Sequence, residues 1–258
     1  SFKATQAAIE MVSGLNKNDT VLFLLSGGGS ALFEKPKITG EELQDITNQL
    51  LACGADIVEI NTIRKRLSEV KGGRFAKLCE PAHVLSIVLS DILGDPLDMI
   101  ASGPACADTT TCEEAWHIVE KYNLNISEDV KKLMDIETPK KLDNVTTFIN
   151  GSVRELCSVV SRECSKYGYE PVMLTDQLCC QAKEAGSFLA SIAKTHCKSG
   201  KKLAYIAGGE TVVNITGHGK GGRNQEIALS AAEGIKGMSN VAVFSIGSAG
   251  TYGCGRWI

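Results

Sequence analysis

The sequence predicts an α/β protein with parallel strands, long enough for one large or two modest domains. Apolar runs at 21–25, at 84–89 with Ser86 as its one polar residue, and at 203–207 are typical of strands buried on both faces of a sheet. Segments with helical apolar spacing lie between these runs. Glycines follow the first run after Ser26, at 27–29, and the third run directly, at 208–209, and such segments mark the turn where a chain leaves a strand.

We expect the two domains to span residues 1–144 and 145–258. Residues 125–144 are polar and irregular, with Pro139 and several lysines, which predicts a connection between domains. In the first domain the patterns predict helices at 4–13, at 39–51 and after Thr111, with strands at 20–25, 56–60 and 84–89. In the second they predict strands at 145–149, 171–174, 203–207, 212–216 and 241–246, and helices at 153–167, at 180–196 and around Ile227.

Two helix starts carry a capping-box pattern. Thr39 is followed three residues later by Glu42, and Thr111 by Glu114, so that the hydroxyl and carboxylate of each pair can bind free backbone N–H groups. Gly14 and Gly54 mark the ends of the preceding helices.

The composition is that of an ordinary folded domain without a strong charge. Of 258 residues, 43% are hydrophobic and 22% charged, and the formal net charge is −3, which gives no reason to expect a nucleic-acid or membrane partner. No apolar run reaches the roughly 18 residues of a membrane span, and the first residues lack a signal-peptide layout. The ten cysteines are scattered, which favours reduced thiols and a cytoplasmic location. A mitochondrial location stays open because the chain does not begin with Met.

The glycine-rich segment after the first strand is a candidate anion site. Glycine adopts positive φ and has no Cβ, so the backbone N–H groups from Gly27 to Ser30 can converge on one anion. An ordinary strand-to-helix turn is the alternative.

A basic segment at 61–74 is a second candidate. It holds five cations and one carboxylate in a chain that is acidic overall, and Lys71-Gly72-Gly73-Arg74 would let backbone and two cations approach one ligand. A solvated helix face is the alternative. Asp91 and Asp95 follow the strand at 84–89, where a Mg²⁺ ion held between carboxylate and phosphate would lie, or where either aspartate caps a turn.

Several familiar motifs are absent. Gly217, Gly219 and Gly222 fit G-x-G-x-x-G, but the next strand pattern does not end in the acidic residue that a dinucleotide fold requires. No P-loop pattern occurs, no G-x-S-x-G or triad partners accompany Ser26 or Ser30, and the histidines lack metal-ligand spacing. Glycine-rich loops, cations and paired carboxylates together favour phosphoryl transfer.

Seven motifs in order along the chain resemble the glycerate 2-kinase family with a MOFRL C-terminal domain. They begin at Leu25 (LSGGGSAL), Asn61 (NTIRKRLS), Lys71 (KGGR), Ser90 (SDILGD), Ile100 (IASGP), Gly208 (GGETVV) and Gly219 (GKGGRNQE). The resemblance implies an ATP- and Mg²⁺-dependent kinase that converts D-glycerate to 2-phosphoglycerate. It also implies a Rossmann-like parallel-sheet domain followed by a smaller α/β domain, with the reaction in a cleft between them.

The resemblance also assigns roles to individual residues. It implies Arg223, Lys71 and Asp91 as catalytic residues, and Asp91 and Asp95 as metal ligands. For binding of phosphate or of the glycerate carboxylate it implies Ser26, Gly27, Gly28, Gly29, Ser30, Arg64, Arg74, Gly208, Gly209, Glu210 and Asn224. A homo-oligomer is left open.

The chain departs from the family pattern at both ends. A preceding segment with a Gly-Lys pair has no match, and residues 250–258 lack the two aspartates of the family's C-terminal stretch. Two alternatives therefore stay open beside glycerate kinase. One is a kinase of another small hydroxy acid, and the other is a catalytically impaired relative that binds ligands or regulates.

Overall fold

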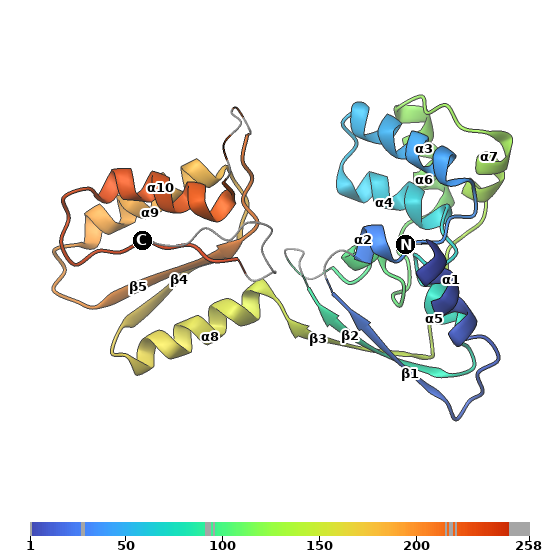
Figure 1. Ribbon diagram of the computed structural model, residues 1–258, viewed down its shortest axis with the longest axis horizontal. Coiled ribbons are helices and arrows are strands. Elements are labelled where there is room, and N and C mark those ends of the chain that lie inside the picture. Colours follow the sequence, from blue (N-terminus) through green and yellow to red (C-terminus); the bar gives the residue numbers. More distant parts are fainter. Residues whose placement is uncertain are drawn as a thin grey trace. The chain divides into compact units, whose positions relative to one another are not determined.

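The computed structural model describes residues 2–26, 29–90, 94, 96–214, 216, 219 and 221–247. Its internal contacts divide the chain into two units, residues 1–150 (unit 1) and 151–258 (unit 2). The division falls six residues after the boundary expected at 144. Each unit has its own sheet and helices (Figure 1).

Unit 1 is organised by a sheet in the order β1-β2-β3, formed by Thr20–Leu25, His83–Leu89 and Val145–Gly151. Strands β1 and β2 run parallel, with Thr20 opposite His83 and Leu25 opposite Val88. Both strands therefore end at the same edge of the sheet. Ser26, the residue after β1, therefore lies at the edge of the sheet where ligands of open α/β sheets bind.

The two faces of β1 differ. Val21 and Phe23 pack into a core with Val84 of β2 and with Phe75, and the Phe23 and Phe75 ring centroids are 4.9 Å apart. On the opposite face Leu22 and Leu24 remain 57% and 67% exposed. The prediction of burial on both faces was therefore wrong for β1 within the described residues, because only one face of this strand has a covering layer.

The helices of unit 1 form a second core beside the sheet. Apolar side chains of α3 (Gly40–Ala52), α4 (Ile57–Arg66), α6 (Cys112–Lys121) and α7 (Glu128–Met134) bury one another there. The shorter elements are α1 (Phe2–Met11), α2 (Gly29–Leu32), α5 (Arg74–Leu78) and the 3₁₀ turn η1 (Ile100–Ser102).

Two expectations for unit 1 were wrong. Residues 56–60 begin a helix and not a strand, because Asp56 accepts a hydrogen bond from the backbone N–H of Glu59 while the Glu59 carboxylate accepts one from that of Asp56. Residues 125–144 include α7, whose Val130 and Met134 are fully buried in the helical core. This stretch belongs to the core of unit 1, although its surface is polar.

Unit 2 contains a parallel pair of strands, β4 (Glu170–Leu178) and β5 (Leu203–Gly209). Figure 1 shows α9 (Ala182–His196) and α10 (Arg223–Ile235) together on one side of this pair and α8 (Val153–Lys166) on the other. Helices α9 and α10 pack so closely that a Cβ built on Gly186 would lie 2.3 Å from the carbonyl oxygen of Ile227.

The strands expected at 212–216 and 241–246 were not found in the described part of unit 2. Val212 forms a single parallel bridge with Gln181, and residues 241–247 form no regular element. Both segments have apolar patterns typical of strands. Such a segment forms a strand only where a neighbouring strand offers a continuous series of backbone hydrogen bonds. Nowhere in the described ranges is a helix long and apolar enough to cross a lipid bilayer.

Candidate active site

The start of α2 approaches η1 so closely that only glycine fits at position 29. A Cβ on Gly29 would lie 2.7 Å from the Cβ of Ala101 and 3.1 Å from a methyl group of Leu25. Ser26 is exposed and Ser30 is half-buried, whereas Gly27 and Gly28 lie outside the described residues. The glycine at 29 is thus explained by packing against η1.

Two cations of the predicted set converge on one carbonyl oxygen beneath this segment. Lys71 Nζ donates to the carbonyl oxygen of Ser30 at 2.9 Å, and Arg64 Nη2 donates to the same oxygen at 3.0 Å. Lys71 also donates to the carbonyl oxygen of Ala101 at 3.2 Å, and so joins α2 to η1. The structure therefore brings Arg64, Lys71 and Ser30 together, although they lie far apart in the sequence.

A buried carboxylate that sequence reasoning missed lies beside these cations. Glu34 Oε2 is 3.5 Å from Arg64 Nη2 and 3.7 Å from Lys71 Nζ, and the Glu34 side chain is 3% exposed. Burial lowers the pKa of Lys71 to about 8 and the nearby charge of Arg64 lowers it too, while the charge of Glu34 opposes both. No local pattern around Glu34 marks it as a counter-ion in the sequence.

The motifs at 71–74 and 101–104 form one interlocked unit. The backbone N–H groups of Gly72 and Gly73 donate to the carbonyl oxygens of Ser102 and Gly103 at 2.9 and 2.7 Å. Ala101 and Ser102 have φ of 52° and 61°, a left-handed conformation that costs about 1–3 kcal/mol for each residue. These contacts hold the strained turn in place beside Lys71.

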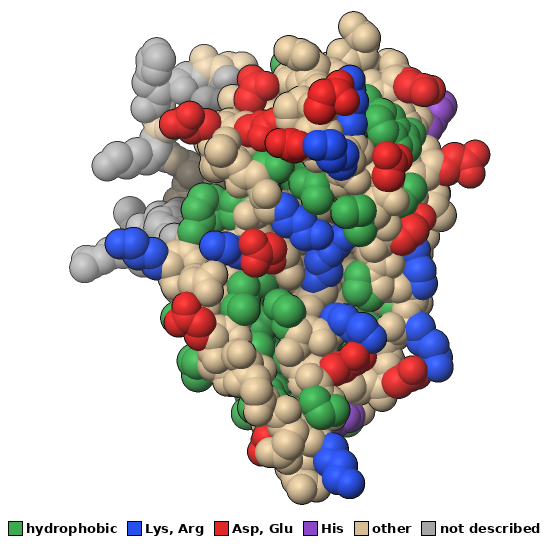
Figure 2. All heavy atoms as spheres, turned by 90° about the vertical axis from the view of Figure 1, so that its right-hand side faces the viewer, with side chains coloured by type: hydrophobic (Ala, Val, Ile, Leu, Met, Phe, Trp, Pro, Cys, Tyr) green, Lys and Arg blue, Asp and Glu red, His purple; other side chains and the backbone are tan. Residues whose placement is uncertain are grey.

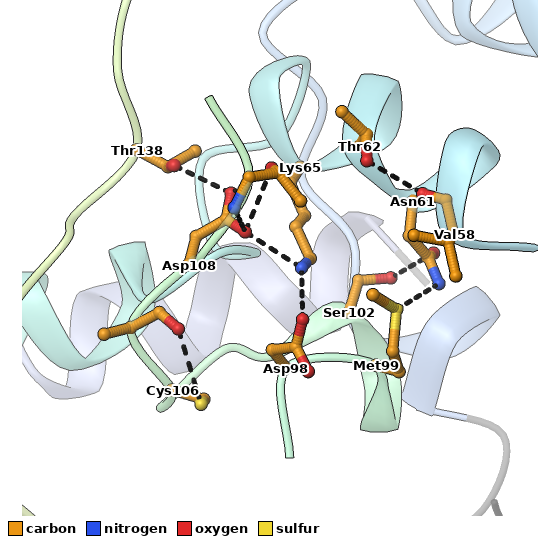
Figure 3. Close-up of polar contacts among 12 residues, drawn as sticks. Val58, Asn61, Thr62, Lys65, Asp98, Met99, Ser102, Cys106, Asp108 and Thr138 are labelled. Atoms are coloured by element: carbon orange, nitrogen blue, oxygen red, sulfur yellow. Dashed lines mark hydrogen bonds and ion pairs between the residues drawn. The ribbon is translucent and has the colours of Figure 1, made fainter. Parts of the chain in front are cut away.

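A second buried ion cluster surrounds Lys65, whose side chain is fully buried (Figure 3). Lys65 Nζ lies 3.0 Å from Asp108 Oδ1 and 3.2 Å from Asp98 Oδ2. Burial raises the pKa of Asp108, but a hydrogen bond from Thr138 and the charge of Lys65 outweigh this effect and hold the pKa below its usual value. The cluster fastens α4 to residues 98–110 and to the stretch before β3.

Ser102 connects this cluster to α4 as well. In Figure 3 its hydroxyl points toward Asn61, to which it donates a hydrogen bond of 2.9 Å. Both side chains are buried. The strained turn at 101–103 is therefore held from the helix side and from the side of Gly72 and Gly73.

Most of the basic segment points inward. Lys65, Arg66 and Lys71 are fully buried, and Arg74 is 9% exposed and donates to the carbonyl oxygen of Lys65 at 2.7 Å. Burial lowers the pKa of Arg74, assisted by the charge of Arg66. The expectation of a basic anion surface over 61–74 was wrong, and so was its alternative of a solvated face, because acids from distant segments neutralise these cations. Figure 2 shows basic and acidic side chains interspersed over one face of unit 1.

In unit 2, Arg223 opens α10 with its side chain 47% exposed. Its guanidinium forms an ion pair with Glu210 and donates to the carbonyl oxygen of Thr211 at 3.1 Å. Asn224 accepts a hydrogen bond of 2.5 Å from Ser245. The three predicted residues Arg223, Glu210 and Asn224 thus lie near the start of α10 and the end of β5.

The glycines at 208 and 209 are required by packing. A Cβ on Gly208 would lie 2.5 Å from the sulfur of Cys157, and one on Gly209 would lie 2.1 Å from the carbonyl oxygen of Leu178. Residues larger than glycine would push β5 away from α8 and β4. This packing accounts for both glycines without a ligand.

The predicted metal ligands Asp91 and Asp95 lie outside the described residues. Across the described ranges, no group of three or more His, Cys, Asp and Glu side chains is arranged to hold a metal ion. A protein-bound Mg²⁺ site therefore stays a prediction.

Comparison with known proteins matches both parts of the chain to family models. Residues 1–135 match a domain of unknown function (DUF4147), and residues 203–256 match the MOFRL family. D-glycerate 2-kinase of Thermotoga maritima is 49% identical over 98% of this chain and 62% of its own length. Glycerate kinase of Macaca fascicularis is 31% identical over 100% of this chain and 80% of its own. The chain belongs to the glycerate 2-kinase family.

Solved structures agree with this family assignment. The crystal structure of the Thermotoga maritima glycerate kinase superposes with a TM-score of 0.87 at 50% identity, over 92% of this chain and 58% of that one. A Pyrococcus horikoshii protein gives a TM-score of 0.78 at 39% identity. The resemblance drawn from the motifs and the predicted α/β fold class are confirmed. The chain spans about three fifths of the length of its Thermotoga relative.

Proposed function

We propose that this chain transfers the terminal phosphoryl group of ATP to the 2-hydroxyl of D-glycerate, forming 2-phosphoglycerate and ADP. The observation that carries the proposal is the 49% identity to a D-glycerate 2-kinase over 98% of the chain. The convergence of Arg64 and Lys71 under the segment after β1 supports it, because phosphoryl transfer depends on positioning and on electrostatic stabilisation.

In unit 1 we assign anion binding to the segment from Ser26 to Ser30, through its backbone N–H groups. Arg64, with a 19% exposed side chain, is the cation that can also reach a ligand. Lys71 is fully buried, so we assign it to charge stabilisation beneath the segment and not to direct contact with substrate. Arg74 supports the same region from within through its bond to Lys65.

In unit 2 we assign Arg223 to the transferring phosphoryl group. A guanidinium binds phosphate oxygens two at a time, and this side chain is half exposed. Glu210 orients Arg223, and Asn224 together with the backbone at 208–209 supplies further polar contacts to substrate.

The donor is proposed to be ATP with Mg²⁺. Asp91 and Asp95 are the candidate protein ligands of the ion, which would offset the negative charge that develops on the phosphates during transfer. Asp91 is the candidate partner of the substrate hydroxyl as well. The other roles proposed above need no metal ion, because side chains and backbone N–H groups of this chain perform them.

The proposal is tested by incubating the purified chain with ATP, Mg²⁺ and D-glycerate. We expect ADP release that depends on D-glycerate, with 2-phosphoglycerate identified by ³¹P NMR. Glycerol, which lacks the carboxylate, and D-lactate, which lacks the 3-hydroxyl, are matched acceptors. Faster turnover of another hydroxy acid would overturn the assignment of D-glycerate as the substrate. Binding of D-glycerate or ATP in calorimetry without turnover would overturn the assignment of kinase activity.

A further inference from the structure

Glu34 lies in a loop, but both oxygens of its buried carboxylate contact polar groups. Its Oε1 accepts a hydrogen bond of 2.5 Å from the hydroxyl of Ser68, while its Oε2 faces Arg64 and Lys71. Its backbone N–H donates to the hydroxyl of Thr5 in α1 at 3.1 Å. Glu34 is therefore held through its backbone and through its carboxylate, and the carboxylate cannot turn toward solvent without breaking its contacts with Ser68 and the two cations.

The two oxygens of Glu34 have different partners. The Ser68 hydroxyl that binds Oε1 also accepts hydrogen bonds from the backbone N–H groups of Val70 and Lys71, both at 3.3 Å. Oε1 thus fixes the backbone that carries Lys71, and Oε2 faces the charged end of the same residue. This arrangement determines where the Lys71 ammonium lies.

The charges of Glu34, Arg64 and Lys71 do not cancel. Arg64 and Lys71 carry two positive charges, and Glu34 cancels one of them, so one positive charge remains beside the carbonyl oxygen of Ser30. Removal of Glu34 would leave the buried Lys71 and the partly exposed Arg64 within reach of one carbonyl oxygen, without a neutralising charge. A lysine in that position loses its proton more readily, because burial and a neighbouring cation both disfavour its charged form.

We propose that Glu34 is a positioning residue for phosphoryl transfer, which holds Arg64 and Lys71 against the Ser30 carbonyl and thereby fixes Ser30 at the end of the proposed anion-binding segment. This proposal rests on the proposed kinase function. Glu34 acts through the two cations and does not contact the substrate itself.

The test uses Glu34→Gln, which keeps the shape of the side chain and removes its charge. We expect kcat at pH 8 to fall several-fold, with a smaller loss at pH 6, because losing the Glu34 charge lowers the Lys71 pKa further below its present value of about 8 and so removes more of the protonated form at pH 8 than at pH 6. Glu80→Gln is the matched control, since Glu80 is an exposed partner of Lys77 in the same unit. Loss of activity by the same factor at every pH would overturn the proposal, because a merely structural defect has no such pH dependence.

A double variant separates action through Lys71 from other effects. If Glu34 acts through Lys71, Glu34→Gln combined with Lys71→Met should be no slower than Lys71→Met alone. Additive losses would overturn the proposal. If Glu34→Gln does not fold, Ser68→Ala keeps all three charges, and it should move the pH profile in the same direction by a smaller amount.

A spectroscopic readout makes the inference independent of turnover. Lysine side chains labelled with ¹³C at Cε report their own titration, and the Lys71 signal is assigned by its loss in Lys71→Met. We expect the pKa of Lys71 to be lower in Glu34→Gln than in the wild type, where Glu34 and Arg64 are the charged groups that face it among the described residues. An unchanged titration would overturn the role of Glu34, whereas an inactive wild type with the expected titration would overturn only the kinase function.

Discussion

The backbone N–H of Gly73 donates a hydrogen bond of 2.7 Å to the carbonyl oxygen of Gly103, and both glycines have positive φ, at 80° and 64°. This bond joins two segments that look independent in the sequence. It lies beside Lys71, whose ammonium donates to the carbonyl oxygen of Ala101 in the same turn. The geometry of the candidate site in unit 1 therefore depends on two left-handed turns that hold each other.

The first prediction concerns Gly73→Ala. A Cβ at this position would lie 2.9 Å from the carbonyl oxygen of Cys106, and φ is 80°. We expect the free energy of unfolding to fall by about 2–4 kcal/mol, from left-handed strain and displaced backbone together.

Gly14→Ala is the matched control for Gly73→Ala. Gly14 also has φ of 80°, but nothing lies within 4 Å of a Cβ built there. We expect a loss of only about 1 kcal/mol. Urea unfolding of the two variants measures the difference, and equal losses would contradict the packing argument.

The second prediction concerns the buried pair of Lys65 and Asp108, with 3.0 Å between Nζ and Oδ1. Asp108→Asn leaves the Lys65 ammonium without its buried partner, and we expect a loss of about 3–5 kcal/mol in the free energy of unfolding. Asp143→Asn, which removes the partner of Lys141 in an exposed pair, should change it by less than about 1 kcal/mol. Similar values for the two variants in chemical denaturation would argue against a buried charge cluster.

The third prediction concerns Arg223→Ala. Because Arg223 is half exposed, we expect a stability change within about 0.5 kcal/mol, but a loss of about 100-fold or more in kcat. Arg223→Lys should restore little, since an ammonium cannot bind two phosphate oxygens in the same plane. Arg162→Ala, at a 65% exposed position in α8, is the control. Steady-state kinetics measures the loss in kcat of each variant. Near-normal turnover of Arg223→Ala would remove Arg223 from the mechanism.

The fourth prediction concerns the pH dependence of stability. Burial lowers the pKa of Lys71 from 10.5 to about 8, so between these values the unfolded chain binds more protons than the folded one. The contribution of Lys71 to the free energy of unfolding therefore rises with pH from about 8 to 10.5, by at most about 1.4 kcal/mol per pH unit, and below pH 8 the buried charge costs stability. Unfolding of wild type and Lys71→Met over this range should show the wild type gaining relative to the variant. A constant difference would show that the Lys71 pKa is not lowered.

Local pattern was enough to place many of the elements. The strand predicted at 20–25 is β1 with the same bounds, and Thr39 and Thr111 accept hydrogen bonds from Glu42 and Glu114 at the predicted helix starts. These signals are contained within a few residues, because strand and capping preferences depend on neighbours in the chain. Residues 56–60 were predicted as a strand because their apolar residues fit a short strand pattern, but the capping box of Asp56 and Glu59 starts a helix there.

The sequence by itself also determined the family, because seven motifs in the right order are specific even where each is ambiguous alone. The sequence could not determine whether the charged side chains at 61–74 are buried or exposed. Whether Lys65 and Lys71 face solvent or the interior depends on Asp108 and Glu34, which lie 43 and 37 positions away in the chain. Only the tertiary structure brings those carboxylates within a few ångströms, and an ammonium group can be buried only where such partners meet it.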